Sequence, residues 1–197
     1  RSMLHRNATV AATILTMAIS AVGAQTPAAS AVAQPETGPR VGDTASEVTL
    51  AGATKDGVTG MTVTLSKFRG QTVVVAFFPK ARTNGCTAQM TNYRDQYATL
   101  FNGGRGVQVI AISTDPDTAL ASWAKEANFP VLFASDIKGD VGKLYGAYLE
   151  KQKVDNRLLF VVGPDGKITY TAKPFKAFVA ESYAELGIAV KKTAGSK

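Results

Sequence analysis

Residues 73–89 read VVVAFFPKARTNGCTAQ. Val73 to Phe78 form a continuous apolar, β-branched run, which is typical of a strand buried on both faces of a sheet. After Cys86, apolar residues recur at helical spacing until Gly103-Gly104 ends the predicted helix: Met90, Tyr93, Tyr97, Leu100 and Phe101. Open α/β sheets form their sites at the carboxyl edge of the strands, so this stretch places Cys86 at such an edge and at the start of a helix.

The flanking segments extend this pattern into a complete domain. We predict an antiparallel pair at 47–50 and 61–65, buried strands at 107–112 and 131–134, and a short helix at 141–145. Asp115-Pro116 predicts the N-cap and first-turn proline of a helix carrying Leu120, Trp123 and Ala127. Gly163-Pro164-Asp165-Gly166 predicts a hairpin between strands at 158–162 and 168–171, and a last helix covers 175–186. The order predicts an α/β fold of the thioredoxin-like kind, with a central mixed sheet flanked by helices.

The ends of the chain differ in composition from the middle. Arg1, His5 and Arg6, an uncharged apolar run at 8–22 and a small-residue cleavage site at 22–24 predict a secretion signal over 1–24. The signal predicts a periplasmic or secreted protein; the alternative is an uncleaved membrane anchor, although the run is short for a span of about 20 strongly apolar residues. An Ala/Pro-rich linker at 25–40, a folded domain at 41–190 and a basic tail at 191–197 complete the predicted organisation.

The net charge of +7 is mostly a property of these ends, because residues 25–190 carry 17 basic and 15 acidic side chains. No cluster of basic residues with interleaved aromatic residues is found, so we expect no nucleic-acid partner.

The counts of cysteine and histidine exclude several chemistries. Cys86 is the only cysteine, so an intrachain disulfide is impossible, and the single histidine, His5, lies in the predicted signal. The absence of histidine from the domain excludes Cys-His and Ser-His-Asp hydrolases, histidine-ligated zinc and haem with a proximal histidine. We expect no metal and no organic cofactor.

The position of Cys86 favours a reactive thiol over a small buried apolar side chain, which is the alternative interpretation. Unpaired backbone N–H groups and the positive end of a helix dipole both favour the thiolate. Arg82 is expected to act in the same direction.

The motif around this cysteine resembles that of the peroxiredoxins. Pro79, Thr83 and Cys86 match the family pattern Pro-x-x-x-Thr-x-x-Cys, and the similarity extends through residues 65–70, 112–115 and 157–166. It covers about Val41 to Leu186, and Gly85-Cys86-Thr87 with Gln89 is most similar to the bacterioferritin-comigratory, or Q-type, branch.

The resemblance implies a role for each matching residue. Cys86 is implied to be the peroxidatic nucleophile, and Thr83 to hold the thiolate and the incoming peroxide. Pro79 is implied to shield the site from water, and Arg157 to stabilise both the thiolate and the developing negative charge. Gln89 is implied to support the hydrogen bonds around Arg157. Each also has an ordinary structural alternative: a strand end for Pro79, a turn residue for Thr83, and solvated surface residues for Arg157 and Gln89.

The sequence departs from the family pattern at several positions. Thr91 stands where most Q-type relatives carry a resolving cysteine, and no second cysteine exists. The resemblance therefore implies a one-cysteine peroxidase that reduces hydrogen peroxide and organic hydroperoxides with an external thiol, a redoxin-like partner or a second chain. Ala81-Arg82 and Asn84 are also unusual, and Gly163 replaces a commonly acidic residue.

Two other functions remain open from the sequence. Thiol–disulfide exchange of the exported thioredoxin type usually needs Cys-x-x-Cys, but Thr83 occupies the first of those positions. A redox-sensing or binding protein on the same scaffold is the third, since fold does not fix function. The expected state is a monomer or a homodimer.

Overall fold

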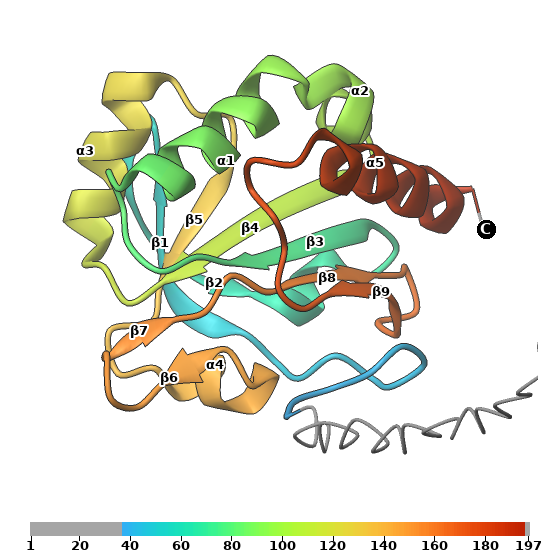
Figure 1. Cartoon of the computed structure of the whole chain (residues 1–197), viewed down its shortest axis with the longest axis horizontal. Helices are drawn as coiled ribbons and strands as arrows, with labels where there is room; N and C mark the ends of the chain where they lie inside the picture. The colour runs from blue at the N-terminus through green and yellow to red at the C-terminus, as the bar shows by residue number, and fades with distance from the viewer. Residues whose placement is uncertain (1–36, 196–197) are drawn as a thin grey trace, which may run out of the picture. The chain divides into compact units, whose positions relative to one another are not determined.

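A seven-stranded sheet forms the centre of the protein in a computed structural model, which describes residues 37–195 (Figure 1). The strand order is β2-β1-β5-β4-β3-β8-β9, in which β3, β4 and β5 run parallel and the other neighbouring pairs run antiparallel. The strands are β1 Thr49–Thr54, β2 Gly57–Thr64, β3 Thr72–Phe77, β4 Val107–Ser113, β5 Leu132–Ser135, β8 Leu159–Val162 and β9 Ile168–Ala172. A separate pair joins β6 Tyr148–Leu149 to β7 Val154–Asp155.

Strand β3 separates two hydrophobic cores by the period-two alternation of its side chains. Val74 and Ala76 pack with α1 Asn84–Asp95, α2 Tyr97–Phe101, α3 Asp117–Ala127 and α5 Ala180–Ala194 on one face. Val73, Val75 and Phe77 pack on the other face with α4 Asp140–Tyr145 and the region of the 3-10 helix Leu65–Phe68; a second 3-10 helix covers Asn102–Gly104. The helices lie on both sides of the sheet in Figure 1. The predicted mixed sheet with flanking helices is confirmed.

The helix predicted after Cys86 is interrupted. α1 ends at Asp95, and Gln96 leaves helical geometry with φ −109° and ψ 20° before α2 begins. The interruption redirects the chain onto α5, where a Leu100 methyl group lies 3.3 Å from the position a Cβ would take at Gly187. The apolar spacing predicts a single helix because the same spacing continues from α1 into α2.

The last helix begins and ends later than predicted. α5 covers Ala180–Ala194, whereas the prediction was 175–186. Phe175 and Ala177 are buried, but they belong to a loop in which the Phe175 N–H donates to the Arg157 carbonyl at 2.8 Å. The predicted start of the helix is wrong because the apolar residues of the loop continue the helical spacing of the apolar residues in α5.

The predicted cap of α3 is also wrong. Pro116 is the N-cap residue and α3 begins at Asp117. The Asp115 carboxylate does not cap the helix, because its Oδ2 accepts hydrogen bonds from the Ala81 N–H at 2.8 Å and the Ser113 hydroxyl at 2.9 Å.

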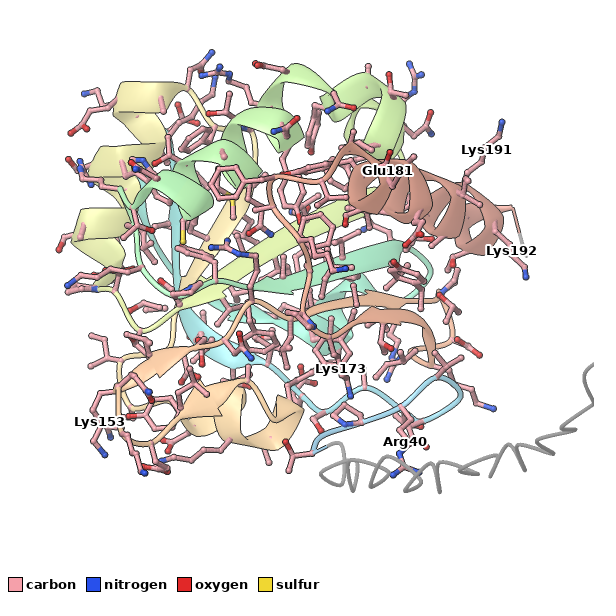
Figure 2. The ribbon with its side chains drawn as sticks, viewed as in Figure 1. Arg40, Lys153, Lys173, Glu181, Lys191 and Lys192 are labelled. Carbon is pink, nitrogen blue, oxygen red and sulfur yellow. The ribbon has the colours of Figure 1, made fainter. Side chains whose placement is uncertain are left out.

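Both ends of the described region contact the domain. The predicted signal and residues 25–36 of the predicted linker lie outside the described residues, but the Pro39 carbonyl accepts a hydrogen bond from Lys173 Nζ at 2.8 Å. Lys191 and Lys192 of the predicted basic tail lie in the last turn of α5 and project from its end (Figure 2). None of the helices within residues 37–195 is long and apolar enough to cross a membrane.

Candidate active site

Cys86 is the third residue of α1. Thr83 is the N-cap residue with extended geometry, and the helix begins at Asn84. The backbone N–H groups of a first helical turn have no partner within the helix, so Cys86 lies where negative charge is favoured. Its side chain is fully buried in the core between the sheet and α1. The predicted placement of a lone cysteine at the start of a helix is therefore confirmed.

Arg157 reaches Cys86 from a distant part of the chain. It lies between β7 and β8, and its Nη2 is 3.4 Å from the Cys86 Sγ although 71 residues separate the two. Its carbonyl accepts the hydrogen bond from Phe175, which fixes the backbone beside β9. A half-buried guanidinium at this distance stabilises a thiolate and any negative oxygen formed next to it.

Gln89 connects Arg157 to the core. Its side-chain oxygen accepts a hydrogen bond from Arg157 Nη1, and its side-chain nitrogen donates to the Tyr93 hydroxyl at 2.9 Å. Gln89 and Tyr93 are both fully buried. Burial raises the pKa of Tyr93 far above its ordinary value, so the phenol stays neutral. Gln89 therefore links the guanidinium of Arg157 to the hydroxyl of the buried Tyr93.

Pro79 and Thr83 border the loop that precedes Cys86. Pro79 is half-buried just after β3, and the next turn is held by the Asp115 carboxylate through the Ala81 N–H. The Thr83 hydroxyl is exposed and donates to the Lys80 carbonyl at 2.9 Å. This is the turn contact named above as the structural alternative for Thr83, and its role toward the thiolate stays a prediction.

Arg82 points away from Cys86, contrary to expectation. Its Nη2 lies 2.6 Å from the Glu126 Oε1 and 3.2 Å from the Ser122 hydroxyl on α3. Hydrogen bonds from Ser122 and Arg82 lower the pKa of Glu126. The expectation that Arg82 supports the thiolate is wrong, because a left-handed backbone at φ 64° turns the side chain toward α3.

The chain is similar in sequence to proteins of one family. Residues 41–171 match the AhpC/TSA family. The chain is 35% identical over 123 residues to peroxiredoxin Bcp of Escherichia coli strain K12, which covers 59% of this chain and 78% of that protein.

The chain belongs to the AhpC/TSA family of peroxiredoxins.

Other relatives agree with the predicted branch of the peroxiredoxins. Chloroplastic peroxiredoxin Q of Populus jackii is 37% identical over 87 residues, which is 44% of this chain and 40% of that protein. The crystal structure of peroxidoxin BcpB from Mycobacterium tuberculosis superposes with a TM-score of 0.65 and 25% identity, covering 78% of this chain and 97% of the other. Proteins of this family are thiol-dependent peroxidases, so the peroxiredoxin assigned from the motif is confirmed.

Sequence reasoning missed several residues of this peroxiredoxin's site. Tyr93 lies four residues after Gln89 and therefore on the same helix face. This spacing is the sequence signal that could have identified the pair. Asp115 was predicted to cap α3. An acidic side chain that follows a strand end can also accept a hydrogen bond from a neighbouring loop, as Asp115 does from the Ala81 N–H. Nothing in the sequence placed Phe178, whose ring is near Gly85 and Arg157 in the folded chain.

Proposed function

We propose that Cys86 is the peroxidatic residue and that the protein reduces peroxides by a one-cysteine mechanism. The observation that carries the proposal is the Arg157 Nη2 3.4 Å from a buried sulfur at the first turn of α1. A thiolate held in this way needs no general base, which agrees with a domain that contains no histidine.

The chemistry follows from these contacts. The Cys86 thiolate attacks the terminal peroxide oxygen; an S–O bond forms while the O–O bond breaks, and the leaving oxygen takes a proton and departs as water or alcohol. The sulfur is oxidised to a sulfenic acid and the peroxide is reduced by two electrons. Arg157 stabilises the charge on both oxygens during the displacement, and Gln89 keeps the guanidinium in place. Pro79 covers the strand end beside the site.

An external thiol completes the cycle. Thr91 replaces the resolving cysteine, so a small thiol, a redoxin-like protein or Cys86 of a second chain attacks the sulfenic sulfur and releases water. A second thiol then attacks the mixed disulfide, which restores Cys86 and yields an oxidised disulfide.

The test is the oxidation of reduced protein by a small excess of hydrogen peroxide, followed by intact mass and a sulfenic-acid trap, with Cys86→Ser as the control. Oxidation within seconds at micromolar peroxide is expected. A thiol no faster than free cysteine contradicts the proposal and leaves thiol–disulfide exchange or binding as the function of the scaffold.

We also propose that the protein is exported. The charged start, apolar run and small-residue site of residues 1–24 support the proposal. Fractionation of cells that express the full chain, with intact mass of the recovered protein, is expected to find a periplasmic or secreted form cleaved after Ala24. A full-length form in the cytoplasm contradicts export, and a full-length form in the membrane fraction indicates an anchor.

A further inference from the structure

Asn84 and Gly85 form an Asn-Gly pair at the start of α1, directly before Cys86. Asn84 is also one of the positions at which the sequence departs from the peroxiredoxin pattern. Glycine has no side chain to obstruct its backbone nitrogen, so that nitrogen can approach the side chain of the asparagine before it. An asparagine in this context can lose its amide group without an enzyme, through attack by the next backbone nitrogen.

Both reacting groups of this pair are free in the structure. The Asn84 side chain is exposed and makes no hydrogen bond to another of residues 37–195. Gly85 is the second residue of α1, so its N–H lies in the first turn, where no carbonyl of the helix accepts it. The other Asn-Gly pair of the chain differs, because the Asn102 side-chain nitrogen donates to the Arg105 carbonyl at 2.9 Å. The structure therefore favours reaction at Asn84.

We propose that Asn84 is a site of spontaneous deamidation and that its products lower the reactivity of Cys86. The Gly85 nitrogen attacks the side-chain carbonyl carbon of Asn84 and forms a C–N bond. The bond to the side-chain amide nitrogen breaks, and ammonia leaves with the proton of the Gly85 N–H. Water then opens the succinimide ring at either carbonyl, which gives aspartate or isoaspartate at position 84. The reaction consumes one water molecule and needs no oxidant or reductant.

Either product places a carboxylate next to the sulfur. The first turn of α1 contains no acidic residue, and the side chain of its N-cap residue Thr83 makes no capping hydrogen bond. The unpaired N–H groups and the positive end of the helix dipole are therefore available to the Cys86 thiolate. A carboxylate at position 84 would interact with the same groups, and its charge would disfavour a second anion on the sulfur two residues later.

Isoaspartate would also move the sulfur away from its arginine. It adds one carbon to the main chain between positions 84 and 85, within the first turn of α1. That turn is closely packed against Arg157, whose Nη2 is 3.4 Å from the Cys86 Sγ and would be 3.0 Å from a Cβ at Gly85. The effect on Cys86 rests on the proposed peroxidase function, whereas the deamidation of Asn84 does not.

The test follows Asn84 and Cys86 in the same samples of reduced full chain, kept at mildly alkaline pH and body temperature. Peptide mapping by mass spectrometry is expected to find the amide of Asn84 replaced by a carboxyl group. Oxidation of Cys86 by hydrogen peroxide is expected to gain a slower phase whose amplitude equals the deamidated fraction. Asn84→Asp carries the charge on an unaltered main chain; we expect a rate constant about tenfold lower, with a urea midpoint unchanged or higher.

Two variants serve as controls. Asn84→Gln is the matched resistant variant, because the longer side chain enlarges the ring that must close. Freshly prepared, it is expected to react like the wild type, and it should keep that rate after the incubation. Asn102→Gln removes the asparagine of the other Asn-Gly pair and is expected to develop the slow phase as the wild type does.

The outcomes separate the two proposals. An Asn84 that keeps its amide throughout the incubation overturns the inference, and so does a deamidated protein that reacts at the fresh rate. A slow phase that also develops in Asn84→Gln, or that disappears in Asn102→Gln, assigns the loss to another position and overturns it too. Fresh wild-type protein that reacts no faster than free cysteine contradicts the proposed function instead, and peptide mapping still measures the deamidation.

Discussion

Gln89 and Cys86 contact the two terminal nitrogens of the same guanidinium. The side-chain oxygen of Gln89 accepts a hydrogen bond from Arg157 Nη1, and Arg157 Nη2 contacts the Cys86 Sγ. A buried amide is a firm support for a cation, because both of its polar atoms are occupied and its position on α1 is fixed by packing. Gln89 therefore positions the guanidinium beside the sulfur through its hydrogen bonds to Arg157 and Tyr93.

Gln89→Leu tests this support. The variant loses the charge-assisted bond to Arg157, and we expect the rate constant of Cys86 oxidation by hydrogen peroxide to fall about tenfold. It also leaves the Tyr93 hydroxyl buried without its partner, so the free energy of unfolding should fall by about 1–3 kcal/mol. Adding Tyr93→Phe should restore stability in urea but not the rate. A rate that recovers together with stability would show that Gln89 acts only through folding.

Gly85→Ala tests how closely the site is packed. The new methyl group would lie 3.0 Å from Arg157 Nη2, so the head of the arginine has to move by a few tenths of an ångström. We expect a fall of about fivefold in the oxidation rate, with a free energy of unfolding unchanged or raised by about 0.5–1 kcal/mol, because alanine favours a helix over glycine. Gly187→Ala on α5 is the matched helical control and should leave the rate unchanged. Equal rates for both variants would contradict the close contact.

Arg82→Ala and Arg157→Ala separate the two arginines. Arg82 pairs with Glu126 on the exposed side of α3, and such pairs contribute about 0–1 kcal/mol. We expect Arg82→Ala to keep the rate of Cys86 oxidation within about twofold and the stability within about 1 kcal/mol. Arg157→Ala removes a donor aimed at the sulfur and should lower the rate by about 100-fold or more. A loss of similar size in both variants would restore a role for Arg82 at the site.

The sequence was sufficient for the parts of the fold that depend on local pattern. The alternation of β3 and the turn before Cys86 were readable, since burial on two faces leaves an unbroken apolar run. The motif also brought Pro79, Cys86 and Gln89 to one edge, because strand, loop and helix are adjacent in the chain.

Contacts between distant segments were not readable from local pattern. The side chain of Arg82 turned to α3 because of a left-handed backbone, and Asp115 bound a loop N–H that lies 34 residues away. Phe178 is a further case, because it falls within the helix predicted over 175–186, whereas the structure places it in the loop before α5. Residue type gives the interactions available to a side chain, but the packing of the chain selects among them.

Asp155 is a fully buried carboxyl group at the end of β7. Within residues 37–195 neither of its carboxylate oxygens has a hydrogen-bond partner. Burial and, to a smaller extent, the charge of Asp136 raise its pKa from the ordinary 3.8 to about 8. The folded protein therefore keeps Asp155 protonated at pH values where the unfolded chain has released the proton.

This difference predicts a stability that falls as pH rises. Below about pH 4 both states hold the proton and the contribution is fully present; between about pH 4 and pH 8 only the folded state holds it, so the free energy of unfolding decreases by at most about 1.4 kcal/mol per pH unit. Asp155→Asn carries no ionisable group at this position, so urea unfolding should show a shallower fall than the wild type, the two curves diverging by on the order of 2–4 kcal/mol between pH 4 and pH 8. The change in slope is the readout, because the buried amide adds a constant offset. Asp56→Asn removes an exposed carboxylate and should run parallel to the wild type. Parallel curves for Asp155→Asn as well would mean that Asp155 is ionised in the folded protein, with its charge stabilised by bound water.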